Sequence, residues 1–204
     1  MKKILIACLA IFALGSNAFA QEEYSIMPKV GDVRAGLGWG WALNLHFDGT
    51  PHSKPINPIF ATADYTFLTF AEDKGSLAGG AMFEFCNYRT WSTDRDIQTL
   101  GFKTTHTWTN GVLVGTATVR YVLTEGIEVY GMVFLGRNFQ LGYKEEYSDE
   151  SYAAIIPHTS GPGDSPADGI RIGFTTHMEK KLYMSVFAGL GGYTTVGFLG
   201  YYKF

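Results

Sequence analysis

The residues from Val33 to Phe47, VRAGLGWGWALNLHF, decide the fold, because every odd position is apolar and every even position is small or polar. A period of two is the period of a β-strand, whose side chains alternate between two faces. The bulky Trp, Leu and Phe side chains share one face, and the opposite face is largely glycine and alanine. This pattern is typical of a transmembrane strand with an apolar lipid face and a narrow, closely packed lumen.

Seven further segments continue the alternation with decreasing clarity, at residues 58–70, 76–88, 111–122, 127–142, 169–178, 182–190 and 195–204. The segment 182–190 is apolar on both faces, so its sequence does not say which face points outward. Arg137 interrupts the pattern of segment 127–142, which predicts either a β-bulge or the end of the lipid-facing zone there.

The connections between these segments alternate in length. Three are tight, at 71–75, 123–126 and 179–181, and three are long and polar, at 48–57, 89–110 and 143–168. Outer-membrane barrels have short periplasmic turns and longer extracellular loops. We therefore predict an all-β protein, a closed antiparallel up-and-down transmembrane β-barrel of eight strands with both termini in the periplasm. Ten strands are the alternative, with a hairpin hidden in 143–168, although Gly161 and Pro162 favour a loop there.

The first twenty residues have the order of a secretory signal peptide. Lys2 and Lys3 precede an apolar run, and the small-residue site Ala18-Phe19-Ala20 follows it. The run is too short for a membrane-spanning helix, which needs about 20 residues. We predict a signal peptide at 1–20, cleaved on export, and a barrel domain at 21–204.

Composition limits the other functional classes. Removal of residues 1–20 takes away two lysines and no acidic residue, so the formal charge changes from −3 to −5, and nucleic acid is not an expected partner. The mature chain keeps one cysteine, Cys86, so an internal disulfide is impossible and the cysteine count gives no metal site. We expect no cofactor.

Aromatic residues gather where the segments meet the short turns, as in the interfacial girdle of a membrane barrel, at Phe67, Phe70, Tyr121, Tyr130, Tyr183 and Phe204. The chain also ends on the aromatic-x-aromatic sequence Tyr202-Lys203-Phe204.

With these features the chain resembles the small eight-stranded outer-membrane barrels of the OmpX and OmpA transmembrane-domain class, and more loosely the barrel-domain proteins of the Bacteroidetes. The resemblance implies a bacterial outer-membrane location with lipopolysaccharide as the lipid of the outer leaflet. It also implies that Tyr202 and Phe204 form the signal read by the barrel-assembly machinery. A glycine that such signals carry five residues before the end is displaced here, since Leu199 holds that place and Gly200 follows.

The parity of the segments places six charged side chains in the lumen, three of each sign: Arg34, Asp64, Glu84, Arg120, Glu128 and Arg171. Charges are costly in hydrocarbon unless they face inward and pair. We expect a structural ion-pair plug, with Arg120 and Glu128 opposite each other across the hairpin at 123–126 and Arg34 at the same level. The alternative is a narrow path for ions or protons.

Two other functions are considered. Some barrels of this size are lipid A deacylases or acyltransferases, and Thr175, Thr176, His177 and Ser185 are the candidate residues, although the His-x-Ser order of the deacylase is absent. The other histidines, at 46, 52, 106 and 158, are scattered without metal spacing.

A structural, surface-binding or accessory role through the extracellular loops is the preferred interpretation, with a partner that the sequence does not identify.

A soluble lipocalin-like barrel is the rival fold, because it also has eight up-and-down strands and an export signal. Its apolar face would have to point inward, which would leave the glycine-, alanine- and threonine-rich face in water with little charge. The Gly-x-Trp entry of that family is missing as well.

If Phe204 serves assembly, Phe204→Ala should lower the amount of protein inserted in the outer membrane more than it alters any property of the inserted protein. Quantitative blotting of membrane fractions, normalised to total synthesis, measures this. Wild-type levels of inserted Phe204→Ala protein would contradict the role.

Overall fold

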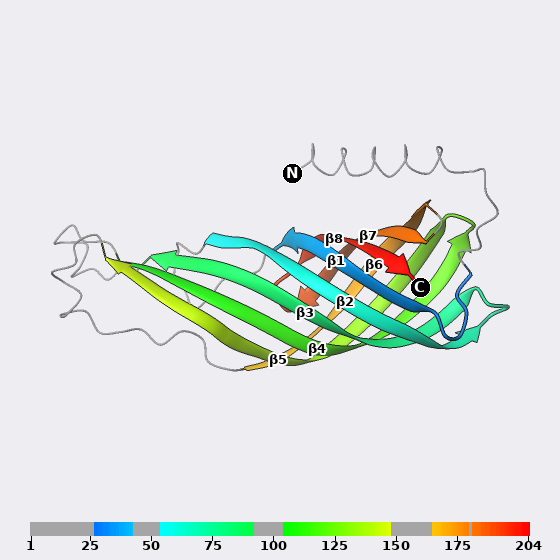
Figure 1. Ribbon diagram of the computed structural model, residues 1–204, viewed down its shortest axis with the longest axis horizontal. Helices are drawn as coiled ribbons and strands as arrows, with labels where there is room; N and C mark the ends of the chain where they lie inside the picture. Colours follow the sequence, from blue (N-terminus) through cyan, green and yellow to red (C-terminus); the bar gives the residue numbers. More distant parts are fainter. Residues whose placement is uncertain (1–26, 43–53, 92–103, 148–164, 180) are drawn as a thin grey trace.

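The computed structural model describes residues 27–42, 54–91, 104–147, 165–179 and 181–204, so the predicted signal peptide lies outside the described residues. The described residues form eight strands (Figure 1): β1 Val33–Trp41, β2 Lys54–Phe70, β3 Gly75–Trp91, β4 Thr104–Thr124, β5 Ile127–Tyr147, β6 Ser165–Glu179, β7 Leu182–Gly191 and β8 Val196–Lys203. None of the described residues forms a helix long and apolar enough to cross a membrane.

The strands follow each other around a closed barrel in chain order, and every neighbouring pair is antiparallel. The ring closes between the first and last strands, where Arg34 pairs with Lys203 and Trp41 with Val196. The backbone N–H of Phe204 adds a hydrogen bond of 2.9 Å to the carbonyl oxygen of Val33. The predicted eight-stranded up-and-down barrel is confirmed, and the ten-stranded alternative is wrong because eight strands close the ring.

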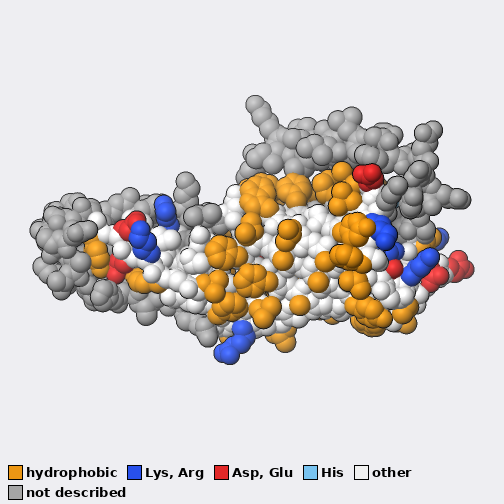
Figure 2. Space-filling model, viewed as in Figure 1, with side chains coloured by type: hydrophobic (Ala, Val, Ile, Leu, Met, Phe, Trp, Pro, Cys, Tyr) orange, Lys and Arg blue, Asp and Glu red, His pale blue; other side chains and the backbone are white. Residues whose placement is uncertain are grey.

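Side-chain exposure follows the predicted parity. Leu37, Leu135 and Ile172 are 74%, 70% and 66% exposed on the outside of the wall, whereas the charged residues Arg34, Glu84, Arg120, Glu128 and Arg171, all predicted to face the lumen, are buried. Figure 2 shows hydrophobic side chains spread over the middle of the barrel wall, with most charged side chains beyond the two ends of this belt. A lipocalin would have the opposite arrangement, so the rival fold is wrong.

Strand β7, whose phase the sequence left open, turns Tyr183, Ser185 and Phe187 inward and Leu182 and Leu190 outward. This corrects the predicted aromatic girdle. Tyr183 is 2% exposed inside the barrel, and Tyr130 also points into the lumen, where it accepts a hydrogen bond from Ser185. The girdle on the outer surface keeps Phe67, Phe70, Tyr121 and Phe204.

The predicted bulge at Arg137 is also wrong. Arg137 pairs in regular register with Leu113 on one side and Pro166 on the other, and it points outward. The bulge lies four residues later, where Thr109 pairs with Gly142 and Asn110 pairs with Gln140, so that Leu141 is the additional residue. The exposed Leu141 lies beyond Arg137 on β5, so the second possibility, the end of the lipid-facing zone at Arg137, stays a prediction.

Glycines on β1 make room for lumen side chains. A Cβ atom on Gly36, Gly38 or Gly40 would overlap Tyr201, the ring of Phe60 or Thr194, respectively. The even positions of β1 are therefore small because side chains from other strands fill the lumen there, as is usual in barrels of eight strands.

Strands β2 to β5 are longer than predicted, and they extend beyond the rest of the barrel (Figure 1). The pairing of β1 with β2 ends at Trp39 and Ile59, and the pairing of β5 with β6 ends at Asn138 and Ser165. Strands β3, β4 and β5 remain paired as far as Trp91, Thr104 and Tyr147. We call this extension, made of 87–91, 104–110 and 139–147, the projecting sheet.

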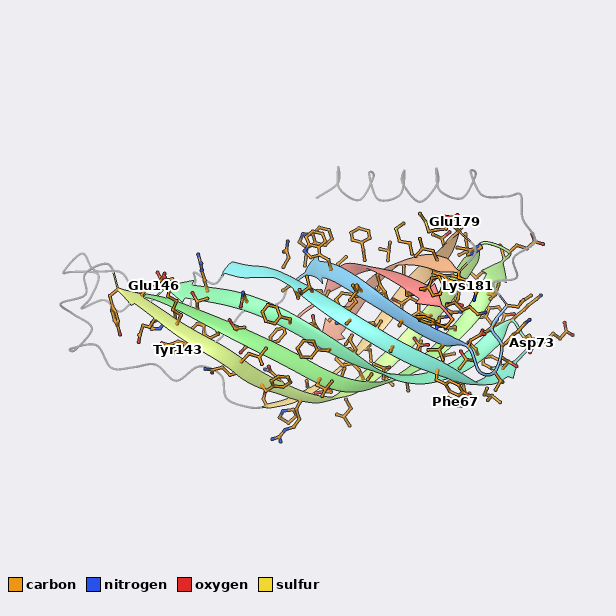
Figure 3. All side chains as sticks on the ribbon, viewed as in Figure 1. Phe67, Asp73, Tyr143, Glu146, Glu179 and Lys181 are labelled. Carbon is orange, nitrogen blue, oxygen red and sulfur yellow. The ribbon has the colours of Figure 1, made fainter. Side chains whose placement is uncertain are left out.

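The projecting sheet lies at the opposite end of the barrel from the short turns. Tyr143 and Glu146 lie at its far end, whereas Phe67, Asp73, Glu179 and Lys181 lie at the short-turn end (Figure 3). The sequence missed this extension because its outward residues are threonines and charged residues, including Thr105, Thr107 and Lys144, which give no apolar alternation. The predicted end of the first segment, 43–47, lies outside the described residues.

The packing at Gly38 gives a testable prediction. Gly38→Ala should lower the free energy of unfolding in urea by about 1–3 kcal/mol, because an added methyl group overpacks the lumen against Phe60. Gly131→Ala is the matched control, since a Cβ atom at Gly131 meets nothing within 4 Å. Equal stabilities of the two variants would show that the lumen is not filled at Gly38.

Candidate functional site

The candidate site is the group of charged residues inside the barrel, to which six consecutive strands contribute one residue each: Arg34 from β1, Asp64 from β2, Glu84 from β3, Arg120 from β4, Glu128 from β5 and Arg171 from β6. Strand parity turns all six toward the lumen, and they form three ion pairs across it. Each pair joins strands that are not neighbours in the barrel wall.

The first pair lies near the short-turn end. Arg34 donates two hydrogen bonds to Glu128, of 2.8 Å from Nη1 to Oε1 and 2.9 Å from Nη2 to Oε2. The two side chains are only 2% and 1% exposed. A forked contact of this kind fixes the orientation of both groups as well as their distance.

Two tyrosines support the guanidinium of Arg34. Its Nη1 donates to the Tyr201 hydroxyl at 3.2 Å, and this hydroxyl donates to Oγ1 of Thr175 at 2.9 Å. The rings of Tyr183 and Tyr201 stack with centroids 5.4 Å apart, and the guanidinium lies 5.3 Å and 5.5 Å from the two centroids. The arginine charge thus meets both a carboxylate and aromatic faces.

The second pair is Arg120 with Asp64, at 2.6 Å between Nη2 and Oδ2. Arg120 also approaches Glu128, at 3.6 Å between Nε and Oε1. The prediction that Arg120 and Glu128 stand opposite each other across the hairpin is wrong, because Glu128 pairs with Val122 and Arg120 pairs with Tyr130. In this register Arg120 lies two residues further from the hairpin turn than Val122, the partner of Glu128, and Glu128 reaches across the lumen to Arg34.

The third pair lies further toward the projecting sheet. Arg171 donates to Glu84 at 3.0 Å, and the side chains are 1% and 0% exposed. The hydroxyl of Thr194 donates a short hydrogen bond to the other oxygen of Glu84. Three rings surround the guanidinium, with centroids 5.1, 5.3 and 4.8 Å away, from Phe60, Phe134 and Phe187.

Chemically, this arrangement neutralises charge and fills space. Three guanidinium groups face three carboxylates, and Phe60, Met82, Phe134 and Phe187 pack around the pair nearest the projecting sheet. Within the described residues, no group of three or more His, Cys, Asp or Glu side chains could hold a metal ion.

The candidate residues for lipid A chemistry have other contacts. Ser185 and Thr175 are opposite each other in the register of β6 and β7, and both are buried inside the barrel. The Ser185 hydroxyl donates to Tyr130 at 3.1 Å, and Oγ1 of Thr175 accepts from Tyr201. Their hydroxyl groups therefore belong to the hydrogen-bond network of the lumen and do not face the lipid surface.

The concave side of the projecting sheet carries a cluster that the sequence did not single out. His106 and Trp108 of β4 face Glu145 and Tyr143 of β5 in register. The Tyr143 hydroxyl lies 2.6 Å from Nδ1 of His106, and the Glu145 carboxylate lies 3.3 Å from it. The rings of His106, Trp108 and Tyr143 are in mutual contact, with centroids 5.6 Å apart for His106 and Trp108, 6.0 Å for His106 and Tyr143, and 5.6 Å for Trp108 and Tyr143. The sequence signal that could have revealed this cluster is the alternation of residues on 104–110, which puts a histidine and a tryptophan two residues apart on one face of the strand.

Burial decides the protonation of this cluster. It lowers the pKa of His106 despite the opposing effect of Glu145, and it raises the pKa of Tyr143 to about 12. Both groups are therefore neutral at neutral pH, and their contact is an ordinary hydrogen bond that ties β4 to β5. His46, His52 and His158 lie outside the described residues.

The two residues predicted to form the assembly signal lie on the outer surface. Tyr202 and Phe204 are 44% and 67% exposed, and their rings meet edge to face with centroids 5.0 Å apart. Lys203 between them points the other way and forms an ion pair of 2.6 Å with Asp32.

Comparison of the fold with solved structures finds similar barrels. A crystal structure of Ail, the attachment invasion locus protein of Yersinia pestis, in complex with the heparin analogue sucrose octasulfate is 11% identical, with a TM-score of 0.41; the match covers 86% of this chain and 100% of that one. The backbone structure of Ail in a phospholipid bilayer nanodisc is 13% identical, with a TM-score of 0.38, covering 85% and 99%.

These similarities concern the fold alone. The number, order and closure of the strands are those of the predicted eight-stranded up-and-down barrel. No protein-family model and no curated protein matches the chain. The Bacteroidetes part of the resemblance stays a prediction.

The buried ion pair of Arg34 and Glu128 gives the next prediction. Glu128→Gln should lower the free energy of unfolding by about 3–5 kcal/mol, because it leaves Arg34 buried without its carboxylate. The double variant Arg34→Met/Glu128→Leu should lose less than the single variant, since neither charge then remains buried. Urea unfolding followed by gel mobility measures both.

The exposed pair of Lys144 and Glu146 provides the control, because its side chains are 71% and 50% exposed. Glu146→Gln should unfold at the same urea concentration as the wild type. If Glu128→Gln also unfolds there, the lumen pair does not stabilise the barrel.

Proposed function

We propose that this chain is an outer-membrane protein whose barrel spans the membrane with a closed lumen and whose projecting sheet and loops bind a partner at the cell surface. The observation that carries the proposal is the inverted distribution of side chains. Large apolar residues are exposed on the barrel wall, and ionised residues are buried inside it. Lipid is the solvent that favours this distribution.

Strand dimensions support the membrane assignment. A transmembrane β-strand needs about 9–11 residues. Strands β1, β7 and β8 have 9, 10 and 8 residues, which is about this length. Strands β4 and β5 have 21 residues each, so roughly half of each remains to stand outside the membrane. In this orientation the short turns lie in the periplasm and the projecting sheet lies outside the cell.

The export and assembly steps complete the proposal. Residues 1–20 direct export and are removed, and lipopolysaccharide surrounds the outer half of the barrel. Tyr202 and Phe204 are the residues that the barrel-assembly machinery reads. Their exposure at the end of β8, next to the seam with β1, supports this role, because a recognition signal has to be accessible before the barrel closes.

A closed lumen favours a structural or binding role over transport. Three ion pairs and the aromatic rings around Arg171 occupy the cross-section at two levels. An ion would have to separate a buried pair to pass, and separating buried charges is costly.

A binding role at the surface is supported by the rigidity of the projecting sheet. Three paired strands, the hydrogen bond of His106 with Tyr143 and the stacked rings hold the sheet in one shape. The long connections 92–103 and 148–164 leave from its end, and the second of them is acidic, with Asp149, Glu150 and Asp164. Loops presented by a rigid scaffold commonly carry binding. An accessory role in a larger membrane complex would use the same surface.

Conductance measurement tests the closed lumen. Purified protein in planar bilayers should show no channel openings at any applied voltage, because the ion pairs block the lumen. The positive variant replaces all six charged residues of the lumen by alanine, since it removes the ion pairs at both levels. Openings of the wild-type protein would contradict the plug and favour the ion-path alternative.

Shortening the projecting sheet tests the binding role. A variant in which tight turns replace 87–109 and 139–164 removes the projecting sheet and keeps the pairs from Cys86 and Asn110, and from Asn138 and Ser165, toward the short turns. It should keep its heat-modifiable gel mobility and lose proteins that co-purify with the full chain from native membranes. If both versions retain the same proteins, or neither retains any, the projecting sheet is not the binding surface.

A further inference from the structure

A small cavity lies inside the barrel between the ion pairs. Its volume is about 30 Å³, and its lining includes Arg34, Arg120 and Arg171 together with Asp64. A buried water needs roughly 10–15 Å³ for its centre, so the cavity has room for one or two molecules of that size. The remaining walls are largely apolar, with Phe60, Phe187 and Leu199 among them.

The charged lining residues carry polar atoms whose hydrogen-bonding capacity is unmet by protein groups. Among the described residues, Nε of Arg34, Nε of Arg171, Nη1 of Arg120 and Oδ1 of Asp64 are buried and make no hydrogen bond. The three arginine side chains are 2%, 1% and 5% exposed in the order 34, 171 and 120. Buried donors and acceptors in native proteins are almost always satisfied, by protein or by ordered water.

These four polar atoms determine which kind of molecule can bind in the cavity. Three N–H donors require an acceptor, and the carboxylate oxygen of Asp64 requires a donor. An anion would meet the arginines but would face Asp64, and a cation would face three guanidinium groups. Water accepts and donates, so it satisfies both kinds of atom at once.

We propose that the cavity is a water-binding site, and that one or two ordered waters bridge the Arg171–Glu84 pair to the Arg34–Glu128 and Arg120–Asp64 pairs. The plug is then one continuous polar network rather than two separate levels. The proposal goes beyond the surface-binding function and depends only on the lumen contacts. The apolar walls make exchange of these waters with solvent slow.

Nuclear magnetic resonance of the full mature chain in nanodiscs tests the proposal, with nitrogen-15 in the arginine side chains. The Nε–H protons of Arg34 and Arg171 should give cross-peaks to water with the sign of a long-lived bound molecule. Protected Nε–H signals without water cross-peaks would overturn the proposal. A change of these signals with chloride, at constant ionic strength with acetate, would overturn it in favour of an anion.

Two variants of Thr118, another lining residue, make the result specific to the cavity. Thr118→Leu fills the space and should remove the water cross-peaks. Thr118→Val keeps the size of the side chain and should retain them. Retention in both variants would show that the water lies elsewhere, and the wild-type spectrum alone decides the outcome if Thr118→Leu does not fold. None of these outcomes depends on binding at the cell surface.

Discussion

Every charge inside this barrel has to meet an opposite charge, because the wall around it offers no water. The lumen of an eight-stranded barrel is only wide enough for side chains. Charged groups there are removed from bulk water, and an unpaired one would be strongly destabilising. The six consecutive strands that contribute one charge each must therefore keep their register, since a slip of one residue would turn a charge outward into lipid.

The same pairs hold the barrel together in a direction that backbone hydrogen bonds do not reach. Ladders join each strand to its neighbours, whereas Arg34–Glu128, Asp64–Arg120 and Glu84–Arg171 join strands that are not neighbours. The three glycines of β1 belong to this arrangement, because their missing side chains give space to Phe60, Tyr201 and Thr194. With the lumen closed as proposed, the surface beyond the membrane is the place where the protein would act on other molecules.

Period and turn length were sufficient to predict the barrel, its strand order and which charged residues face the lumen, since lipid imposes one rule on every strand. These two signals do not predict which charged residues form ion pairs with each other in the lumen. Parity says that Glu128 points inward, but its forked contact with Arg34 depends on distances across the lumen, which period and turn length do not give. The sequence places Tyr130 and Tyr183 in the outer girdle, because an aromatic residue near a turn can face either the lipid or the lumen. The projecting sheet was missed because strands outside the membrane follow no apolar rule.

The central claim is that one side of each strand faces lipid and the other faces a closed interior. Spin labels placed one at a time at positions 112–121 of β4, in protein reconstituted in bilayers, measure this most directly. We predict that labels at odd positions, such as Leu113 and Val119, collide freely with oxygen dissolved in the lipid, while labels at Val112 and Thr118 do not. Odd positions accessible instead to a water-soluble nickel complex, or accessibility without alternation, would contradict a membrane-spanning barrel.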